Sequence, residues 1–192
     1  MTKIALPLAL ASLAVGSVVA APVTFNIDPA HTYPSFETDH FGGMSVWRGK
    51  FTRTSGTVVM DKEAGTGTVD ITIDASSIDL GNAKLEEHTR TADMLDVARY
   101  PTATYKGKLT GFKDGQPTEI DGEFTLRGVT KPLTLKIDSF KCMTYPQDKK
   151  EHCGADATGT FNRADFGINY GDKYNFKMDM RLAIQVEAVR AS

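Results

Sequence analysis

The chain has 192 residues, and its 22 basic and 24 acidic residues give a formal net charge of −2. Domains that bind nucleic acid or anionic membrane surfaces through charge carry a basic excess, so this balance does not favour either partner. The length fits a single domain with a sizeable hydrophobic core.

The first twenty residues have the pattern of an export signal. Lys3 precedes an apolar run from Ile4 to Val15, and Ala20 ends a small-residue cleavage site. The run is shorter than the roughly twenty apolar residues that cross a bilayer. We therefore expect residues 1–20 to be removed as a signal peptide, and residues 21–192 to form one soluble domain in the periplasm.

Short strand signals, separated by turn residues, recur along most of this domain. Alternating apolar and polar residues that end at Gly, Pro, Asn or Asp are typical of β-strands. The predicted strands are Phe25–Ile27, His31–Phe41, Val46–Phe51, Thr57–Met60, Val69–Ile73, Thr102–Leu109, Phe124–Leu126, Leu133–Ile137 and Ala155–Phe161. Many short strands at this spacing favour an antiparallel sandwich or barrel.

One segment near the middle of the chain has helical periodicity instead. Asn82 is a good N-cap residue, and Pro101 marks the end of the segment. The residues that fall on one helical face are Leu85, His88, Ala92 and Leu95. We expect a helix of about three to four turns that closes or lines one end of a barrel.

The last predicted strand has the strongest pattern, because every even position from Tyr174 to Val186 is apolar and every odd position except Ala183 is polar. At about 3.3 Å per residue such a strand is roughly 40 Å long, about twice the usual length. A strand of this length twists and coils, which favours a barrel. A barrel with large apolar side chains inside either packs solid or encloses an apolar ligand.

The sequence contains no phosphate-binding loop, hydrolase elbow or zinc-protease motif, and its four histidines lack metal-site spacing. We therefore expect no metal and no cofactor, and we assign no catalytic residue. The two cysteines, Cys142 and Cys153, are typical of a disulfide if the compartment is oxidising. Two free buried thiols, or a zinc site that includes His152, are the alternatives.

Three polar clusters adjoin apolar residues, and each can place a polar group at the mouth of an apolar pocket. They are Asp39–Phe41 with Trp47 and Arg48, His88–Arg90 with Met94 and Leu95, and Asn162–Gly167. Taken singly, each residue has a simpler interpretation: Trp47 packs in the core, Arg90 is solvated, and Arg163 forms a local ion pair with Asp165.

Several tracts in these clusters and elsewhere match a known family in order. They are Ile27–His31, His40–Val46, Glu87–Asp96, Arg99–Ala103, Gly122–Pro132 and Phe161–Gly167. Through them the chain resembles the YceI-like, lipocalin-like polyisoprenoid-binding proteins over nearly all of residues 21–192. The resemblance implies an all-β fold, an extended antiparallel lipocalin-like β-barrel with one amphipathic helix inserted. It also implies a long internal tunnel for an isoprenoid chain and no established catalysis.

The function that we expect is a periplasmic binding or carrier protein, not an enzyme, for a long-chain isoprenoid such as a quinone precursor or an isoprenoid phosphate. A transient contact with a membrane or membrane protein, and a homodimer, stay open. The expected ligand-binding residues are His88, His40, Trp47, Phe41, Met94, Leu95, Phe124, Leu126, Arg163, Phe166, Phe176, Met178, Met180 and Leu182. Among them we expect His88 to contact the head group, whereas Arg90 anchors the helix to neighbouring strands.

Two rival functions stand beside the carrier. An isoprenoid- or quinone-modifying enzyme would use His88 or His40 as an acid or base, and would hold a second titratable group against it. A ligand-free envelope stress protein would have a barrel with a solid core.

Overall fold

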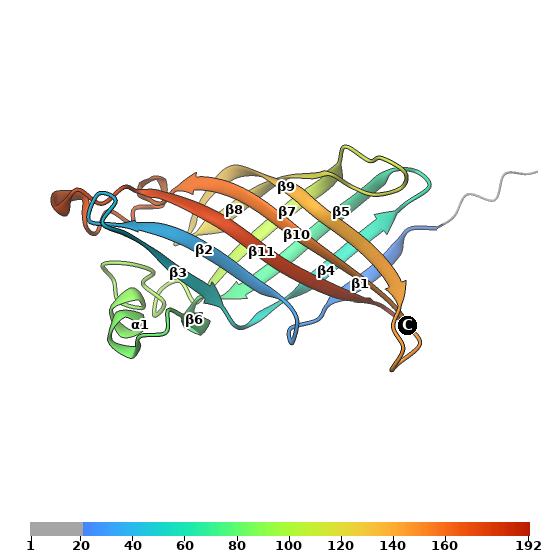
Figure 1. Cartoon of the computed structure of the whole chain (residues 1–192), viewed down its shortest axis with the longest axis horizontal. Coiled ribbons are helices and arrows are strands. Elements are labelled where there is room, and N and C mark those ends of the chain that lie inside the picture. The colour runs from blue at the N-terminus through green and yellow to red at the C-terminus, as the bar shows by residue number, and fades with distance from the viewer. Residues whose placement is uncertain (1–20) are drawn as a thin grey trace, which may run out of the picture.

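The computed structural model describes residues 21–192, most of which form antiparallel strands (Figure 1). The strands are β1 (Val23–Ile27), β2 (Tyr33–His40), β3 (Ser45–Phe51), β4 (Thr54–Asp61), β5 (Thr66–Asp74), β6 (Ile78–Asp79), β7 (Thr102–Thr110), β8 (Glu119–Leu126), β9 (Val129–Thr144), β10 (Glu151–Asn162) and β11 (Asp179–Arg190). The helical elements are α1 (Ala83–Thr89) and the short 3-10 turns η1 (Ala75–Ser77), η2 (Arg163–Phe166) and η3 (Asp172–Tyr174).

Eight strands close into a barrel. β1 pairs with β4 on one side and with β11 on the other, so the order β1-β4-β5-β7-β8-β9-β10-β11 returns to its start. Asn26, for example, lies opposite Thr57 of β4 and Val189 of β11. The structure confirms the expected antiparallel barrel with one inserted helix.

The barrel is extended at one end, because β11 has two neighbours along the same edge. Its residues Ala188–Arg190 pair with β1, whereas Met180–Gln185 pair with β2, which continues the sheet to β3 and β6. We call β2, β3 and β6 the flap. The sheet order does not join the flap to β7, and α1 lies beside β3 and β6 at this end (Figure 1).

Two clusters of buried side chains form the core, one toward each end. One surrounds Phe25, Met60 and Tyr105 inside the closed barrel, and the other surrounds Ile78, Leu95 and Phe166 beneath the flap. In the first cluster the Tyr105 hydroxyl donates to the carbonyl oxygen of Leu133 at 2.8 Å, so this buried polar group is satisfied. Burial raises the pKa of Tyr105, which keeps the hydroxyl protonated.

The last strand begins later, and ends later, than its sequence pattern predicts. β11 spans Asp179–Arg190, and its even positions alternate inward as expected. The expected start was wrong, because Gly171 and Asn175 have positive φ angles of 91° and 61° and enclose the turn η3. Period-two alternation cannot separate a strand from a turn whose alternate side chains also face inward.

The predicted helix was too long. α1 ends at Thr89, and the residues after it form successive turns. The Thr91 hydroxyl donates to the carbonyl oxygen of His88 at 2.7 Å, and such local bonds compete with helix propagation. Asp96, at a φ of 50°, then directs the chain out of helical geometry, although Leu95 is still buried.

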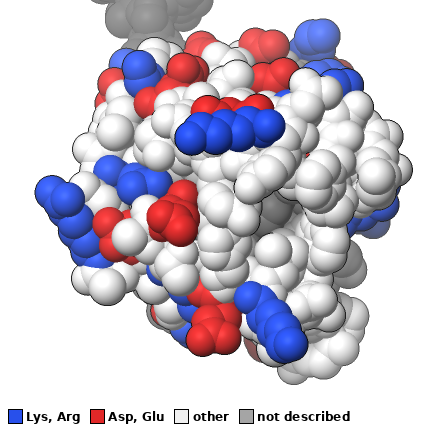
Figure 2. Space-filling view, turned by 90° about the vertical axis from the view of Figure 1, so that its left-hand side faces the viewer, with Lys and Arg blue, Asp and Glu red and all other residues white. Residues whose placement is uncertain are grey.

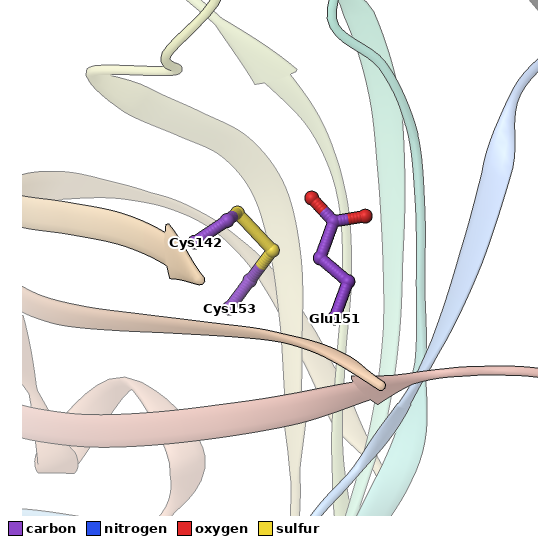
Figure 3. Close-up of side chains that lie close together, drawn as sticks. All are labelled: Cys142, Glu151 and Cys153. Carbon is purple, nitrogen blue, oxygen red and sulfur yellow. A yellow bond between two sulfur atoms is a disulfide. The ribbon is translucent and has the colours of Figure 1, made fainter. Parts of the chain in front are cut away.

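Cys142 and Cys153 form a disulfide, as the sequence predicts. The bond joins two strands directly, because β9 continues to Thr144 and the two cysteines are paired residues of β9 and β10. Figure 3 shows Glu151 beside this bond, and Lys62 and Arg190 engage the Glu151 carboxylate at 2.8 and 3.5 Å. Since both sulfurs are bonded to each other, neither is a thiolate ligand.

The hairpin between β8 and β9 is tighter than the sequence predicts. The predicted strands Phe124–Leu126 and Leu133–Ile137 leave residues 127–132 between them, whereas β9 already begins at Val129 and Pro132 pairs with Glu123. Only Arg127 and Gly128 connect the strands, both at positive φ. This backbone geometry fits the right-handed twist of a two-residue hairpin.

Candidate functional site

The barrel contains two adjoining cavities. The larger has a volume of about 480 Å³ and lies beneath the flap and α1, and the smaller has about 150 Å³ inside the closed barrel. Phe124 and Leu182 line both, so the two form successive compartments along the barrel. The larger volume is in the usual range for small-molecule sites. The barrel is therefore not solid, contrary to the rival with a filled core.

The walls of the cavities follow from strand alternation. Met180, Leu182, Ile184 and Val186 of β11 point inward, whereas the odd residues between them are exposed. On the flap, Gly49 has no side chain where a Cβ atom would lie 2.7 Å from Phe36 and 2.4 Å from Leu80. Gly49 thus lets these two apolar side chains meet in the wall of the larger cavity.

Most of the residues predicted from the sequence converge on the larger cavity, although they lie far apart in the chain. Those that line it are His40, Phe41, Trp47, His88, Met94, Leu95, Phe124, Leu126, Arg163, Phe176, Met180 and Leu182. Their convergence on one apolar cavity makes each of them a candidate ligand contact.

Phe166 and Met178 were also predicted as contacts, but the structure places them outside the cavity lining. Phe166 is buried in the core, with its ring 5.5 Å from that of Phe124 and 5.4 Å from that of Phe161. Met178 precedes β11, and its carbonyl oxygen accepts a hydrogen bond from the Arg163 backbone at 2.9 Å.

Two buried polar groups in the larger cavity lack partners. His88 Nε2 and Arg163 Nε have no hydrogen bond within residues 21–192. Tyr170 links the two side chains, since its ring lies 4.5 Å from that of His88 and its carbonyl oxygen accepts from Arg163 Nη2 at 2.7 Å. A buried group without a partner costs about 1–3 kcal/mol, which a ligand atom can recover.

Arg163 is a buried cation without an ion pair in the described chain. It does not pair with Asp165, as the simpler interpretation proposed; it donates to the carbonyl oxygens of Ile168 and Tyr170. Burial lowers the pKa of Arg163, and the charge of Asp172 opposes this shift. Because a guanidinium stays protonated in proteins, Arg163 provides positive charge beside His88.

The His40 ring lies among three aromatic side chains. Its ring centroid lies 4.7 Å from that of Phe41, 5.2 Å from that of Phe176 and 5.7 Å from that of Trp47. Within residues 21–192, neither His40 nor His88 hydrogen-bonds to a titratable side chain through its ring.

Arg90 confirms its predicted structural role. Its Nε donates to the carbonyl oxygen of Ser76 and its Nη2 to that of Ile78, each at 2.9 Å. These two bonds fix α1 to the segment that includes β6. The sequence reasoning missed other lining residues, among them Phe36, Leu80 and Tyr170. The alternation of β2 could have identified Phe36, but Leu80 and Tyr170 lie in turns that have no periodic signal.

Two loops form the outer end of the larger cavity, and Asp39 joins them. Asp39 Oδ2 accepts the backbone N–H groups of Gly42 at 2.8 Å and Lys177 at 3.0 Å. Gly42 has a φ of 66°, and a Cβ atom there would lie 2.6 Å from the Asn175 side chain. The loop after β2 is therefore packed tightly against the segment before β11.

Asp39→Asn is expected to destabilise the protein in a pH-dependent way. The N–H of Lys177, and then that of Gly42, hold the pKa of Asp39 below its usual value near 3.9. A lowered folded-state pKa gives stability that is complete above the unfolded-state pKa and is lost as the pH falls through the folded-state pKa. Urea titrations of both proteins should show a larger difference in unfolding free energy at about pH 6 than at about pH 2.5. Equal differences at both values would contradict this role of the charge.

A second cluster of titratable groups lies away from the cavity. Asp28, His31 and Glu187 have side-chain ligand atoms within 4.8 Å of one another. His31 Nδ1 bonds to Asp28 Oδ2 at 2.7 Å, which raises the pKa of His31 and joins the loop between β1 and β2 internally.

Among residues 21–192, no helix reaches the length and hydrophobicity that a membrane-spanning helix requires.

Comparison with known proteins identifies the family. A model of the YceI-like domain matches residues 25–188. The chain belongs to the YceI-like family. Protein YceI of Escherichia coli is 34% identical over 193 residues, and that of Salmonella arizonae is 33% identical over 195 residues. Both alignments cover 99% of this chain and 99% of the relative.

Three solved structures have a similar fold. BcnA of Burkholderia cenocepacia has a TM-score of 0.67 at 18% identity, over 84% of this chain and 99% of that protein. The Campylobacter jejuni YceI protein has a TM-score of 0.65 at 24% identity, over 78% and 88%. A structure described as a polyisoprenoid-binding domain from Saccharophagus degradans has a TM-score of 0.62 at 12% identity, over 88% and 99%.

Proposed function

We propose that this YceI-like protein binds and carries a long-chain isoprenoid lipid in its two compartments. The observation that carries the proposal is an apolar cavity of about 480 Å³ that contains two unpartnered buried polar groups, at His88 and Arg163. An apolar tail fits the lining, and a head group with hydrogen-bond acceptors or negative charge fits the polar groups. The description of the Saccharophagus degradans neighbour as polyisoprenoid-binding supports the same ligand class.

Burial of the tail provides the binding energy. At about 25 cal/mol per Å², covering several hundred Å² of an isoprenoid gives on the order of 10 kcal/mol before ordering costs. This is enough to hold an insoluble lipid in water without a covalent bond. Met94 and Met180 in the lining suit an irregular chain, because methionine side chains are flexible and polarisable.

We place this carrier in the periplasm. A disulfide between Cys142 and Cys153 persists in oxidising compartments, and the family is that of YceI proteins. The predicted signal peptide, residues 1–20, lies outside the described residues. Export would also explain why a lipid needs a carrier, since it must cross an aqueous space.

Lipid extraction from the natively produced protein tests the proposal. Mass spectrometry of protein purified from an envelope fraction is expected to find about one isoprenoid chain per protein chain, since the two successive compartments together accommodate one tail. Residues 21–192 expressed in the cytoplasm provide a control, because this protein meets different lipid donors from those of the envelope. A different lipid class at full occupancy, or no isoprenoid uptake by the delipidated protein, would overturn the proposal.

A further inference from the structure

The exposed apolar side chains of this protein gather at one end. Residues 21–192 contain six large hydrophobic side chains that are classed as exposed, and five of them are Phe41, Met44, Val46, Tyr170 and Tyr174. Their exposure ranges from 45% for Tyr170 to 76% for Met44. They lie in the loop after β2, at the start of β3 and in the segment between β10 and β11. We call these five residues the rim.

The rim occupies the end of the molecule that Figure 2 views, where the β2–β3 loop and the segment before β11 project (Figure 1). In this view a broad uncharged area surrounds a hollow, and basic and acidic side chains border it. A contiguous exposed apolar surface of this kind is typical of an interaction site. The sixth exposed residue, Met143 (45% exposed), is in β9 near the disulfide, at the other end of the barrel.

Backbone geometry and specific contacts hold the rim residues in position. Phe41 has a φ of 49°, an unfavourable conformation for a bulky residue that costs about 1–3 kcal/mol. Its ring lies 4.8 Å from that of Phe176 and 6.2 Å from that of Tyr174. Asp39 joins the two loops beneath them through Gly42 and Lys177. The structure therefore holds an aromatic side chain toward solvent in a strained backbone position.

The rim is continuous with the larger cavity. Phe41, Tyr170 and Tyr174 line that cavity and are also exposed to solvent. An apolar chain that enters or leaves at this end therefore passes over the rim. The phase from which such a chain comes is the hydrocarbon interior of a bilayer, so the partner that fits the rim is a lipid surface.

The polar groups around the rim suit a phospholipid interface. The exposed ammonium groups of Lys173 and Lys177 form no ion pair with the rest of residues 21–192. Lysine stems can lie along apolar surface while their charges reach phosphate groups, and tyrosine is favoured at membrane interfaces. Two lysines contribute little to the free energy of membrane binding compared with five apolar side chains. Salt should therefore weaken the contact only slightly.

We propose that the rim docks on a phospholipid bilayer, with the mouth of the larger cavity facing the lipid, so that the isoprenoid moves between bilayer and cavity without crossing water. This inference rests on the proposed carrier function and adds where the carrier meets its donor and acceptor.

Flotation with phosphatidylcholine vesicles that contain no isoprenoid tests the docking. The Met44→Ser/Val46→Ser variant is suitable because neither side chain lines a cavity. The loss of two apolar groups is expected to weaken vesicle binding at least about tenfold, at low and at high salt alike. Met143→Ser, the matched control at the opposite end, should bind vesicles as the wild type does.

A second measurement separates this inference from the carrier function. Binding of a detergent-dispersed isoprenyl alcohol, without vesicles, should be equal in the wild type and in Met44→Ser/Val46→Ser. Weaker vesicle binding together with intact alcohol binding supports the docking. If the wild type binds the alcohol but not the vesicles, the docking proposal is overturned, whereas the proposed carrier function stands. Equal vesicle binding by the rim variant and the Met143→Ser control also overturns it.

Discussion

Leu182→Asp is expected to abolish lipid binding. Leu182 lines both compartments, so a charge at this position interrupts the apolar path where the two meet. An unpaired buried carboxylate costs several kcal/mol, which is a large part of the energy that tail burial supplies. Lipid content measured by mass spectrometry should fall below about one tenth of the wild-type value, because about 1.4 kcal/mol already corresponds to a factor of ten.

The adjacent residue provides a matched control. Ala183 belongs to the same strand but is exposed on its outer face, so Ala183→Asp adds the same charge without entering the cavity. It should retain its lipid. If Leu182→Asp fails to fold, Met180→Asp places the charge in the larger compartment alone and tests the same path. A folded Leu182→Asp or Met180→Asp protein with full lipid content would exclude this tunnel as the binding site.

His88→Ala is expected to reduce discrimination between lipids with and without a polar head. His88 Nε2 is buried in the larger cavity without a hydrogen-bond partner, so a head-group atom can become that partner. Removal of the imidazole should reduce the preference by about 1–3 kcal/mol, while the tail still binds. Competition among an isoprenyl phosphate, its alcohol and its hydrocarbon measures the preference in wild type and variant.

His31→Ala serves as the control for the histidine substitution. His31 bonds to Asp28 and does not line either cavity, so its removal should not change the preference. An unchanged order of affinities in His88→Ala would mean that the head group lies elsewhere, with Arg163 as the next candidate. Binding of the isoprenyl phosphate in particular should depend on Arg163, since this buried guanidinium lacks a counter-ion in the described chain.

The sequence by itself determined the barrel and the character of its lining. Strand alternation is a local property with a period of two residues, so the inward positions of β11 from Met180 to Val186 could be identified without the fold. The same holds for the turn residues that separate the strands and for Asn82, whose side chain caps α1 by accepting from Leu85 N–H at 3.1 Å. The polar clusters beside apolar residues, which also lie in the family tracts, identified His40, His88 and Arg163 as candidates.

Only the tertiary structure decided where the barrel opens and which polar groups meet there. His88 of α1, Arg163 of η2 and Tyr170 come together through packing between segments that are far apart in the chain. The start of β11 depends likewise on distant contacts, such as the bond from Lys177 N–H to Asp39 across 138 residues. Local patterns contain no information on such contacts, because these contacts form only when the barrel closes and distant segments pack together.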